Sequence, residues 1–219
     1  MVQHIGKFPS IRRLPLYLRA ACILREQGRT VVSSAHLARE LGFEQIQVKK
    51  DLEITGVAGK TGVGYPVDAL ITAIETFLNW NNATDAVLIG AGRLGGALLG
   101  YTGFQERALR LVAAFDTDPA KIGARVAGAE VFAMERLEKL VRRLHIHLAV
   151  LTVPADAAQD AAEQCVGAGI RAIWNFTPVK LHLPEHIIVQ REDLSAGLAE
   201  LSVRLKHALE DGADTGAIV

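Results

Sequence analysis

A glycine-rich hexapeptide directly after an apolar run constrains the fold of this chain more than any other feature. The run at 86–89 leads into Gly90-Ala91-Gly92-Arg93-Leu94-Gly95, a helix-like stretch follows, and Asp116 ends the next apolar run. In a strand–turn–helix unit the first glycine permits a tight turn, the second lets the backbone approach a pyrophosphate, and the third lets helix and strand pack closely. The helix N-terminus favours the anion. The motif therefore predicts that Gly90, Ala91, Gly92, Arg93, Leu94, Gly95 and Asp116 bind a dinucleotide.

Alternating strand and helix patterns surround the hexapeptide. Apolar runs typical of strands cover 86–89, 111–115, 148–153, 172–176 and 187–190, and helical patterns cover 92–99, 134–144 and 155–168. Strands buried on both faces indicate a parallel, doubly wound sheet of the Rossmann type. Its ligand lies beyond the carboxyl ends of the strands. We therefore expect the cofactor to meet Thr152, Val153, Pro154, Asn175, Phe176 and Pro178 as well.

The residues around Asp116 favour NAD(H) over NADP(H). Asp116 can accept hydrogen bonds from the adenosine ribose, and Thr117-Asp118 supplies no arginine for a 2′-phosphate. A second acid at Asp118 would repel such a phosphate. The alternative is that the glycines serve only a tight turn between strand and helix.

The first eighty residues have a different character. Residues 1–70 contain ten Lys and Arg against six Asp and Glu, so they form the basic end of a chain without net charge. The pattern predicts, in order, a helix from near Pro15 to Gly28, a strand over 30–32, a helix capped by Ser33 or Ser34 that ends at Gly42, and a third helix from near Glu44. This order is typical of a helix-turn-helix.

The third of these helices carries side chains that can donate to phosphates and base edges. A glycine-rich stretch at 55–65 suits a hairpin wing against a phosphate backbone, and an apolar helical stripe at 70–78 closes the domain. The alternative is an ordinary solvated face. We expect DNA contacts from Gln45, Gln47, Lys49, Lys50 and Lys60.

Several classes of function find no support in the sequence. No apolar stretch is long enough for a membrane helix and the N-terminus is unlike a secretory signal, so a cytoplasmic protein is expected. Cys22 and Cys165 lie in apolar helical patterns and suit buried thiols, and the histidines suggest no metal site. No second domain is available to hold a substrate against a nicotinamide. A small NAD-dependent oxidoreductase, a CoA-binding module and a DNA-inactive cofactor-binding protein stay open as alternatives.

An apolar stripe marks the end of the chain. From Asp193 to Leu209, leucines recur along one helical face. Such a stripe must be covered, and packing on a partner subunit is the more attractive use of it. We accordingly expect a winged-helix domain over 1–80, a Rossmann domain over 81–193, and a dimerisation helix with a frayed tail over 194–219.

Taken together, these motifs resemble those of the Rex family of redox-sensing transcriptional repressors over nearly the whole chain. The resemblance rests on the order of the segments 13–19, 47–52, 59–65, 90–95, 113–116, 151–155, 175–179 and 193–195. It implies a homodimer with exchanged C-terminal helices, and a winged helix that binds a palindromic operator and releases it when NADH binds. The genes controlled would serve respiration or fermentation.

The resemblance also implies a redox switch. Tyr101 and Asp193 of the partner would take part in it, with Arg13 as a competing partner. An apolar pocket near Tyr101 and Phe104 would penalise the charged ring of NAD, which competes with NADH, because desolvating a charge is costly. Two residues depart from the family pattern, since Lys49 and Thr61 stand where arginine is usual. Arginine grips guanine bidentately and lysine cannot match that fork, so operator preference or affinity is expected to differ from that of relatives.

Overall fold

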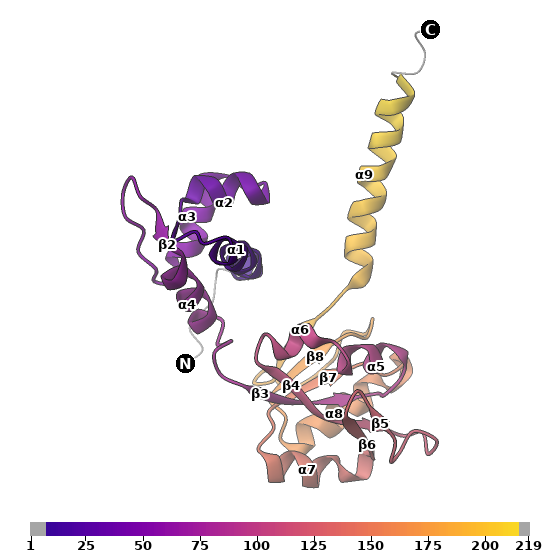
Figure 1. Ribbon diagram of the computed structural model, residues 1–219. Helices are drawn as coiled ribbons and strands as arrows, with labels where there is room; N and C mark the ends of the chain where they lie inside the picture. Colours follow the sequence, from indigo (N-terminus) through magenta and orange to yellow (C-terminus); the bar gives the residue numbers. More distant parts are fainter. Residues whose placement is uncertain (1–7, 215–219) are drawn as a thin grey trace. The chain divides into compact units, whose positions relative to one another are not determined.

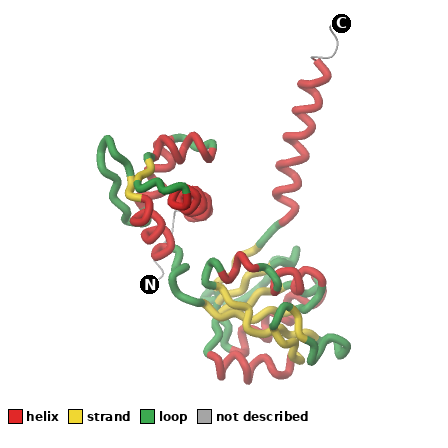
Figure 2. The backbone as a smooth tube through the Cα atoms, in the orientation of Figure 1, coloured by secondary structure: helices red, strands yellow, loops and turns green. Residues whose placement is uncertain are grey.

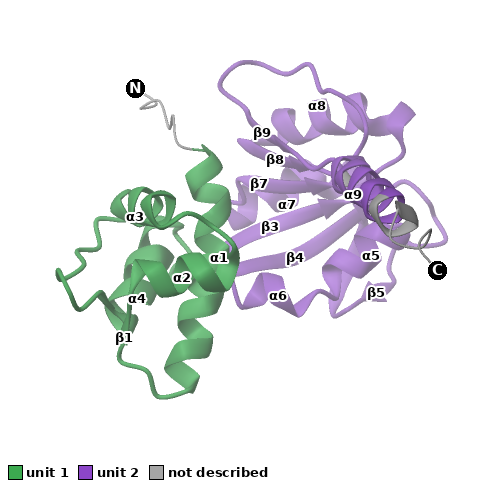
Figure 3. Ribbon diagram, turned by 90° about the horizontal axis from the view of Figure 1, so that it is seen from above, with its two compact units in different colours: residues 1–83 green, residues 84–219 purple. Residues whose placement is uncertain are grey.

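The computed structural model describes residues 8–214, and the side chains of all of these except 194 and 211–214. The chain divides into two compact units, residues 1–83 and residues 84–219 (Figure 3). The first unit is mainly helical, whereas the second is built around a sheet (Figure 2).

Unit 1 is a winged helix-turn-helix. Its elements are α1 (Phe8–Glu26), β1 (Val31–Val32), α2 (Ser34–Leu41), α3 (Gln45–Glu53), β2 (Tyr65–Pro66) and α4 (Val67–Phe77). Of the two expected caps, Ser33 is the one that starts α2, because its side chain accepts a hydrogen bond from the His36 amide. Gly42, in a left-handed conformation, ends the helix as expected.

The first helix is longer than the sequence suggests. It begins at Phe8 rather than near Pro15, and Pro15 lies inside it. A proline there removes one backbone hydrogen bond, a cost that packing must offset. Leu14, Tyr17 and Leu18 supply that packing, because all three are completely buried against residues of α2, α3 and α4.

The wing is a short hairpin that leads into β2. Lys60 and Gly64 exchange backbone hydrogen bonds of 2.8 and 2.9 Å, and β2 pairs antiparallel with β1. Gly64 has φ +107°, and a Cβ there would lie 2.4 Å from the carbonyl oxygen of Val32. Only glycine fits this close approach, so the base of the wing is fixed against β1.

Unit 2 contains a seven-stranded sheet with helices on both faces (Figure 1). Its elements are β3 (Thr84–Ile89), α5 (Arg93–Leu99), α6 (Thr102–Gln105), β4 (Leu109–Asp116), β5 (Arg125–Val126), β6 (Ala129–Ala133), the 3-10 turn η1 (Met134–Arg136), α7 (Leu137–Leu144), β7 (Leu148–Leu151), the 3-10 turn η2 (Ala155–Ala157), α8 (Ala158–Ala168), β8 (Ala172–Asn175), β9 (Ile188–Arg191) and α9 (Leu194–Asp214).

The strand order is β5-β6-β4-β3-β7-β8-β9, and every neighbouring pair is parallel except β5 with β6. The order reverses between β3 and β7, which is the switch point where doubly wound sheets bind ligands. The prediction of a doubly wound parallel sheet is therefore confirmed. The sequence-based prediction missed β5, β6 and α6.

Each face of this sheet has its own apolar core. Phe115, Ile89 and Leu151 belong to the core that α7 and α8 cover, and Leu88, Val131 and Val150 belong to the opposite one with Leu99 of α5. Cys165 lies in the first core, where burial raises the pKa of its thiol to about 12. Cys22 is only partly buried.

The helix α9 presents its apolar side chains to solvent in a single chain. Leu198, Leu201, Leu205 and Leu209 lie along one helical face and are each more than half exposed. The expected leucine-lined helix is therefore present, with its stripe uncovered. Among the described helices, no segment has the length and hydropathy needed to span a bilayer.

Candidate nucleotide cavity and nucleic-acid interface

A cavity of about 670 Å³ lies at the carboxyl ends of β3, β4 and β7 in unit 2. Parallel strands end at one edge of a sheet, so the turns that follow them come together there. Six of the residues expected at the cofactor line this cavity: Gly90, Gly92, Asp116, Thr152, Val153 and Pro154.

The geometry of the glycine loop suits a pyrophosphate. Gly90 has φ +97° and lies against the backbone of Thr152, and a Cβ on Gly95 would be 2.1 Å from the Gly90 carbonyl oxygen. A Cβ on Gly92, in contrast, would meet nothing within 4 Å. The first and third glycines therefore close the turn, and the second leaves open space beside the backbone where a phosphate can approach.

Thr152 holds the loop from the neighbouring strand. Its hydroxyl lies 3.0 Å from the carbonyl oxygen of Ile89 and 2.8 Å from that of Gly90, and its amide donates to Ile89. These bonds tie the start of the glycine loop to the end of β7. The loop is preorganised before any ligand arrives.

Asp116 is buried at the end of β4 and already hydrogen-bonded. Its Oδ2 accepts from the Ala91 amide at 2.8 Å and from Lys121 Nζ at 3.0 Å, and its Oδ1 accepts from the Asp118 amide at 2.9 Å. Burial by itself would raise the pKa of Asp116, but these donors outweigh it and lower the pKa. Asp116 is thus a fixed carboxylate whose Oδ1 can still accept from a ribose hydroxyl.

The sequence-based prediction missed several residues of this cavity. Lys121, Met134, Asp160 and Gln164 also line it. Lys121 follows Asp116 by five positions in a turn, and no pattern in the sequence marks it. Asp160 and Gln164 stand one turn apart on α8, so their spacing was the only available signal.

The other expected cofactor residues lie outside the cavity lining. Asn175 is buried, accepts a hydrogen bond from the Thr177 amide and donates one to the Val179 carbonyl, so it fixes the turn after β8 rather than facing the cavity. Tyr101, Phe104, Phe176 and Trp174 form a chain of ring contacts with centroids 5.0 to 5.4 Å apart. Five further expected residues, Ala91, Arg93, Leu94, Gly95 and Pro178, are likewise absent from that lining.

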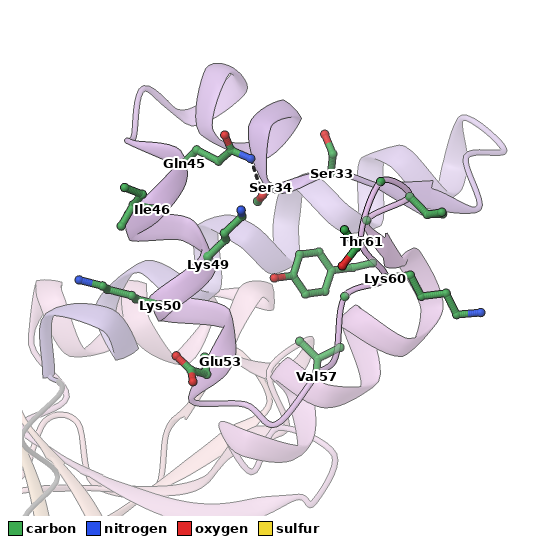
Figure 4. A pocket seen from close by; sticks show the side chains of 15 residues that line it. Ser33, Ser34, Gln45, Ile46, Lys49, Lys50, Glu53, Val57, Lys60 and Thr61 are labelled. Carbon is green, nitrogen blue, oxygen red and sulfur yellow. Dashed lines mark hydrogen bonds between the residues drawn. The ribbon is translucent and has the colours of Figure 1, made fainter.

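A second cavity, of about 610 Å³, lies between α3 and the wing in unit 1 (Figure 4). Three lysines and one acid line it: Lys49, Lys50 and Lys60 with Glu53. In Figure 4 the ammonium groups of Lys50 and Lys60 lie on opposite sides, with Lys49 between them. The excess of positive charge suits a phosphate backbone.

The lining side chains of α3 share one face of that helix. Gln45, Ile46, Lys49, Lys50 and Glu53 line the cavity, and Gln45 donates to the Ser34 hydroxyl at 3.1 Å. Gln47 was also expected to contact DNA, but it is half-buried and does not line the cavity. The sequence-based prediction missed Ser34 and Tyr65, which help to shape this surface.

A buried carboxylate joins α3 to α1. Arg13 binds Asp51 bidentately, with Nε 2.6 Å from Oδ2 and one terminal nitrogen 2.8 Å from Oδ1, and the Tyr17 hydroxyl donates to Oδ2 at 2.7 Å. Burial favours a higher pKa for Asp51, but hydrogen bonds from Arg13, Ser10 and Tyr17 lower it. Arg13, expected in a redox switch, is thus engaged within its own unit.

Asp193 caps the last helix. Its Oδ1 accepts from the amide and the hydroxyl of Ser195, and its Oδ2 lies 3.3 Å from Arg191. These hydrogen bonds from Ser195 lower the pKa of the exposed carboxyl. Asp193 therefore caps α9 in this chain. A role of Asp193 in the redox switch would have to be compatible with this cap.

Two family models match the two units. Residues 8–53 match a putative DNA-binding protein N-terminus, and residues 81–179 match a CoA-binding domain. A redox-sensing transcriptional repressor Rex from Treponema denticola is 49% identical over 203 residues, which is 93% of this chain and 97% of that protein. The chain belongs to the Rex family of redox-sensing transcriptional repressors. A Rex from Bacteroides fragilis is 41% identical over 90% of each chain.

Solved structures of Rex-family repressors share the fold. The repressor RSP in complex with β-NAD⁺ and operator DNA has a TM-score of 0.87 and 33% identity, covering 99% of this chain and 100% of RSP. The complex of RSP with β-NADH has a TM-score of 0.85 and 32% identity, covering 96% and 99%. The names of these relatives describe transcriptional repressors, which are regulators. The resemblance to the Rex family that the sequence motifs indicated is therefore confirmed.

No group of three or more His, Cys, Asp and Glu suited to a metal ion occurs among the described residues.

Proposed function

We propose that this Rex-family chain represses transcription by binding operator DNA when NADH is low, and that it releases the DNA when NADH binds in unit 2. The observation that carries the proposal is the joint presence of a lysine-lined groove in unit 1 and a glycine-loop cavity in unit 2. RSP, which shares this fold over 99% of this chain, has been solved with operator DNA and with β-NADH.

The DNA contacts would come from α3 and the wing. Lys49 and Gln45 on α3 would approach base edges in the major groove, and Lys50 and Lys60 would neutralise phosphates on either side. Gln47 stays a weaker candidate because it lies off the groove-lining face. Lysine at 49 offers a single ammonium where arginine offers a fork, so contacts to guanine would be less selective.

The cofactor would lie across the glycine loop. Gly90 and Gly92 would admit the pyrophosphate, Asp116 would accept from the adenosine ribose, and Val153 with Pro154 would line the wall. Bound NAD(H) would supply a nicotinamide ring whose charge depends on its redox state. Residues that exclude water from that ring would favour the neutral form, and Tyr101 and Phe104 are the candidates.

A homodimer would couple NADH binding in unit 2 to DNA release by unit 1. The leucine face of α9 is uncovered in one chain, and a second copy would bury it by exchanging helices. Asp193 caps this helix, so a hydrogen bond between Tyr101 and Asp193 of the partner would link the nicotinamide region to the dimer contact. Arg13 would have to leave Asp51 before it could compete for that carboxylate.

The direct test is a gel-shift titration. An operator selected from genomic fragments is bound by the protein, and NADH or NAD⁺ is added. We expect NADH to dissolve the complex at concentrations where NAD⁺ does not, and a complex indifferent to NADH would refute the mechanism. A tight response to CoA with none to NADH would favour a CoA-binding module, and hydride transfer to a substrate would favour an oxidoreductase.

The DNA surface has its own test. Lys50→Ala should weaken DNA binding and reduce the slope of log affinity against log salt by about one. The matched control is Lys139→Ala, which removes an exposed lysine from α7 of unit 2. Equal salt slopes for the two variants would remove Lys50 from the interface.

A further inference from the structure

A lysine stands where the sequence indicated only acids. Lys121 Nζ lies 3.0 Å from Asp116 Oδ2 and 3.6 Å from Asp118 Oδ2, and all three residues line the nucleotide cavity. A cation is therefore present at the end of the cavity where Asp116 would meet the adenosine ribose. The lack of an arginine after β4 therefore does not by itself explain a preference for NAD(H), because this lysine could also bind a 2′-phosphate.

We propose that Lys121 is the specificity-determining cation at the ribose 2′-position, kept from binding a 2′-phosphate because Asp116 and Asp118 share it. This inference rests on the proposed binding of NADH in the same cavity. It adds to the proposed function the residue that sets the choice between NADH and NADPH, Lys121, and the mechanism by which it does so.

The charge of this group explains the choice. Two carboxylates and one ammonium leave a net charge of −1, which suits a neutral 2′-hydroxyl and opposes a 2′-phosphate of charge near −2. The Lys121 side chain is 39% exposed, so it can reach a ligand in the cavity. Removing the charge of Asp118 would leave the ammonium paired with Asp116 alone and bring the net charge of the group to zero, so that Lys121 could also donate to a phosphate oxygen.

The two acids, Asp116 and Asp118, differ in burial and in the number of hydrogen bonds that they accept. Asp116 is buried and bonded to the Ala91 and Asp118 amides, so it anchors the glycine loop. Asp118 is half-exposed, and within residues 8–214 its Oδ1 accepts one hydrogen bond, from the Ala120 amide. Asparagine at 118 keeps that acceptor and loses the charge, which makes Asp118→Asn the cleaner perturbation.

The experiment compares NADH and NADPH binding by calorimetry in the full-length wild type, Asp118→Asn and the double variant Asp118→Asn/Lys121→Met. The quantity measured is the ratio of NADPH affinity to NADH affinity. We expect Asp118→Asn to raise this ratio about tenfold, the value of one charge-assisted hydrogen bond. The double variant should return the ratio to the wild-type value or below it.

The double variant separates two explanations. A ratio that stays raised without Lys121 would mean that Asp118 acts by repulsion alone, and the proposal would be overturned. An unchanged ratio in Asp118→Asn would overturn it as well. Asp118→Ser, whose hydroxyl can also accept from the Ala120 amide, repeats the measurement in a second background.

Failure of this inference is distinguishable from failure of the proposed function. A wild-type protein that binds no NADH would refute the function itself. A wild-type protein that binds NADH and releases DNA, with a ratio that does not respond to Asp118 and Lys121, would refute only the specificity role.

Discussion

Replacing Asp51 by asparagine should destabilise unit 1 without touching the DNA-facing side chains. Asp51 lies on α3 with its side chain 2% exposed, and it accepts two hydrogen bonds from Arg13 and one from Tyr17. Asparagine has nearly the same shape, but it offers one acceptor oxygen and no charge. Arg13 would then keep a partly buried cation without its counterion.

The expected cost is about 3 kcal/mol. Removing one member of a buried ion pair typically costs ~3–5 kcal/mol, and the lower end applies because the Arg13 side chain is 20% exposed and can be hydrated. For a unit of 83 residues, this loss lowers the melting midpoint by more than about 10 °C. DNA affinity should fall in parallel, because Asp51 connects α3 to α1.

Tryptophan fluorescence can isolate unit 1. The chain has two tryptophans, Trp80 in unit 1 and Trp174 in unit 2, and Trp80 packs against the core of unit 1. In a Trp174→Phe background, urea unfolding followed at Trp80 reports unit 1 alone. The free energy of unfolding is compared between Trp174→Phe and the double variant Trp174→Phe/Asp51→Asn.

The matched control is Asp68→Asn, the same chemical change at an exposed position in the first turn of α4. It should cost less than about 1 kcal/mol, the value of a helix-dipole contact. Equal destabilisation by Asp51→Asn and Asp68→Asn would refute the reasoning.

The same pair gives a pH dependence with a definite sign. Because the folded-state pKa of Asp51 is lowered, its contribution to stability is present above the unfolded pKa and is lost as the pH falls through the folded pKa. The difference in unfolding free energy between the wild type and Asp51→Asn should therefore shrink below about pH 4. A difference that grows on acidification would contradict this assignment.

Three further outcomes test the remaining structure. Gly95→Ala should abolish NADH binding in calorimetry, because its Cβ would lie 2.1 Å from the Gly90 carbonyl oxygen. The control Gly96→Ala should retain NADH binding, because its Cβ would lie 3.6 Å from the nearest atom. Thr152→Val should weaken NADH binding several-fold, because the glycine loop loses the hydrogen bond, worth about 1 kcal/mol, that the single hydroxyl proton shares between the carbonyl oxygens of Ile89 and Gly90; unchanged affinity would show that the loop does not depend on this hydrogen bond. Leu205→Asp should give monomers in light scattering, whereas Val203→Asp, on the opposite face of α9, should leave dimers; equal effects would contradict a leucine-face contact.

The sequence alone determined the fold class of both units and most of their helices and strands. Strands buried on both faces and helices with one apolar side follow from local periodicity, and Gly90 to Gly95 could only sit where a strand turns into a helix. The capping by Ser33 and the end at Gly42 were equally local. The short strands β5 and β6 were not predicted, because their residues lack a pattern and are defined by pairing with each other and with β4.

Only the tertiary structure decided which charged residues meet. Asp51 looks like one more polar residue on a helix with two lysines, yet it is buried because Arg13, 38 positions earlier, reaches it from α1. Lys121 has no motif of its own, and it acquires a role because a turn brings it back to Asp116 at the cavity. Periodicity records which face of an element is buried, whereas the partner of a buried charge depends on how distant elements pack.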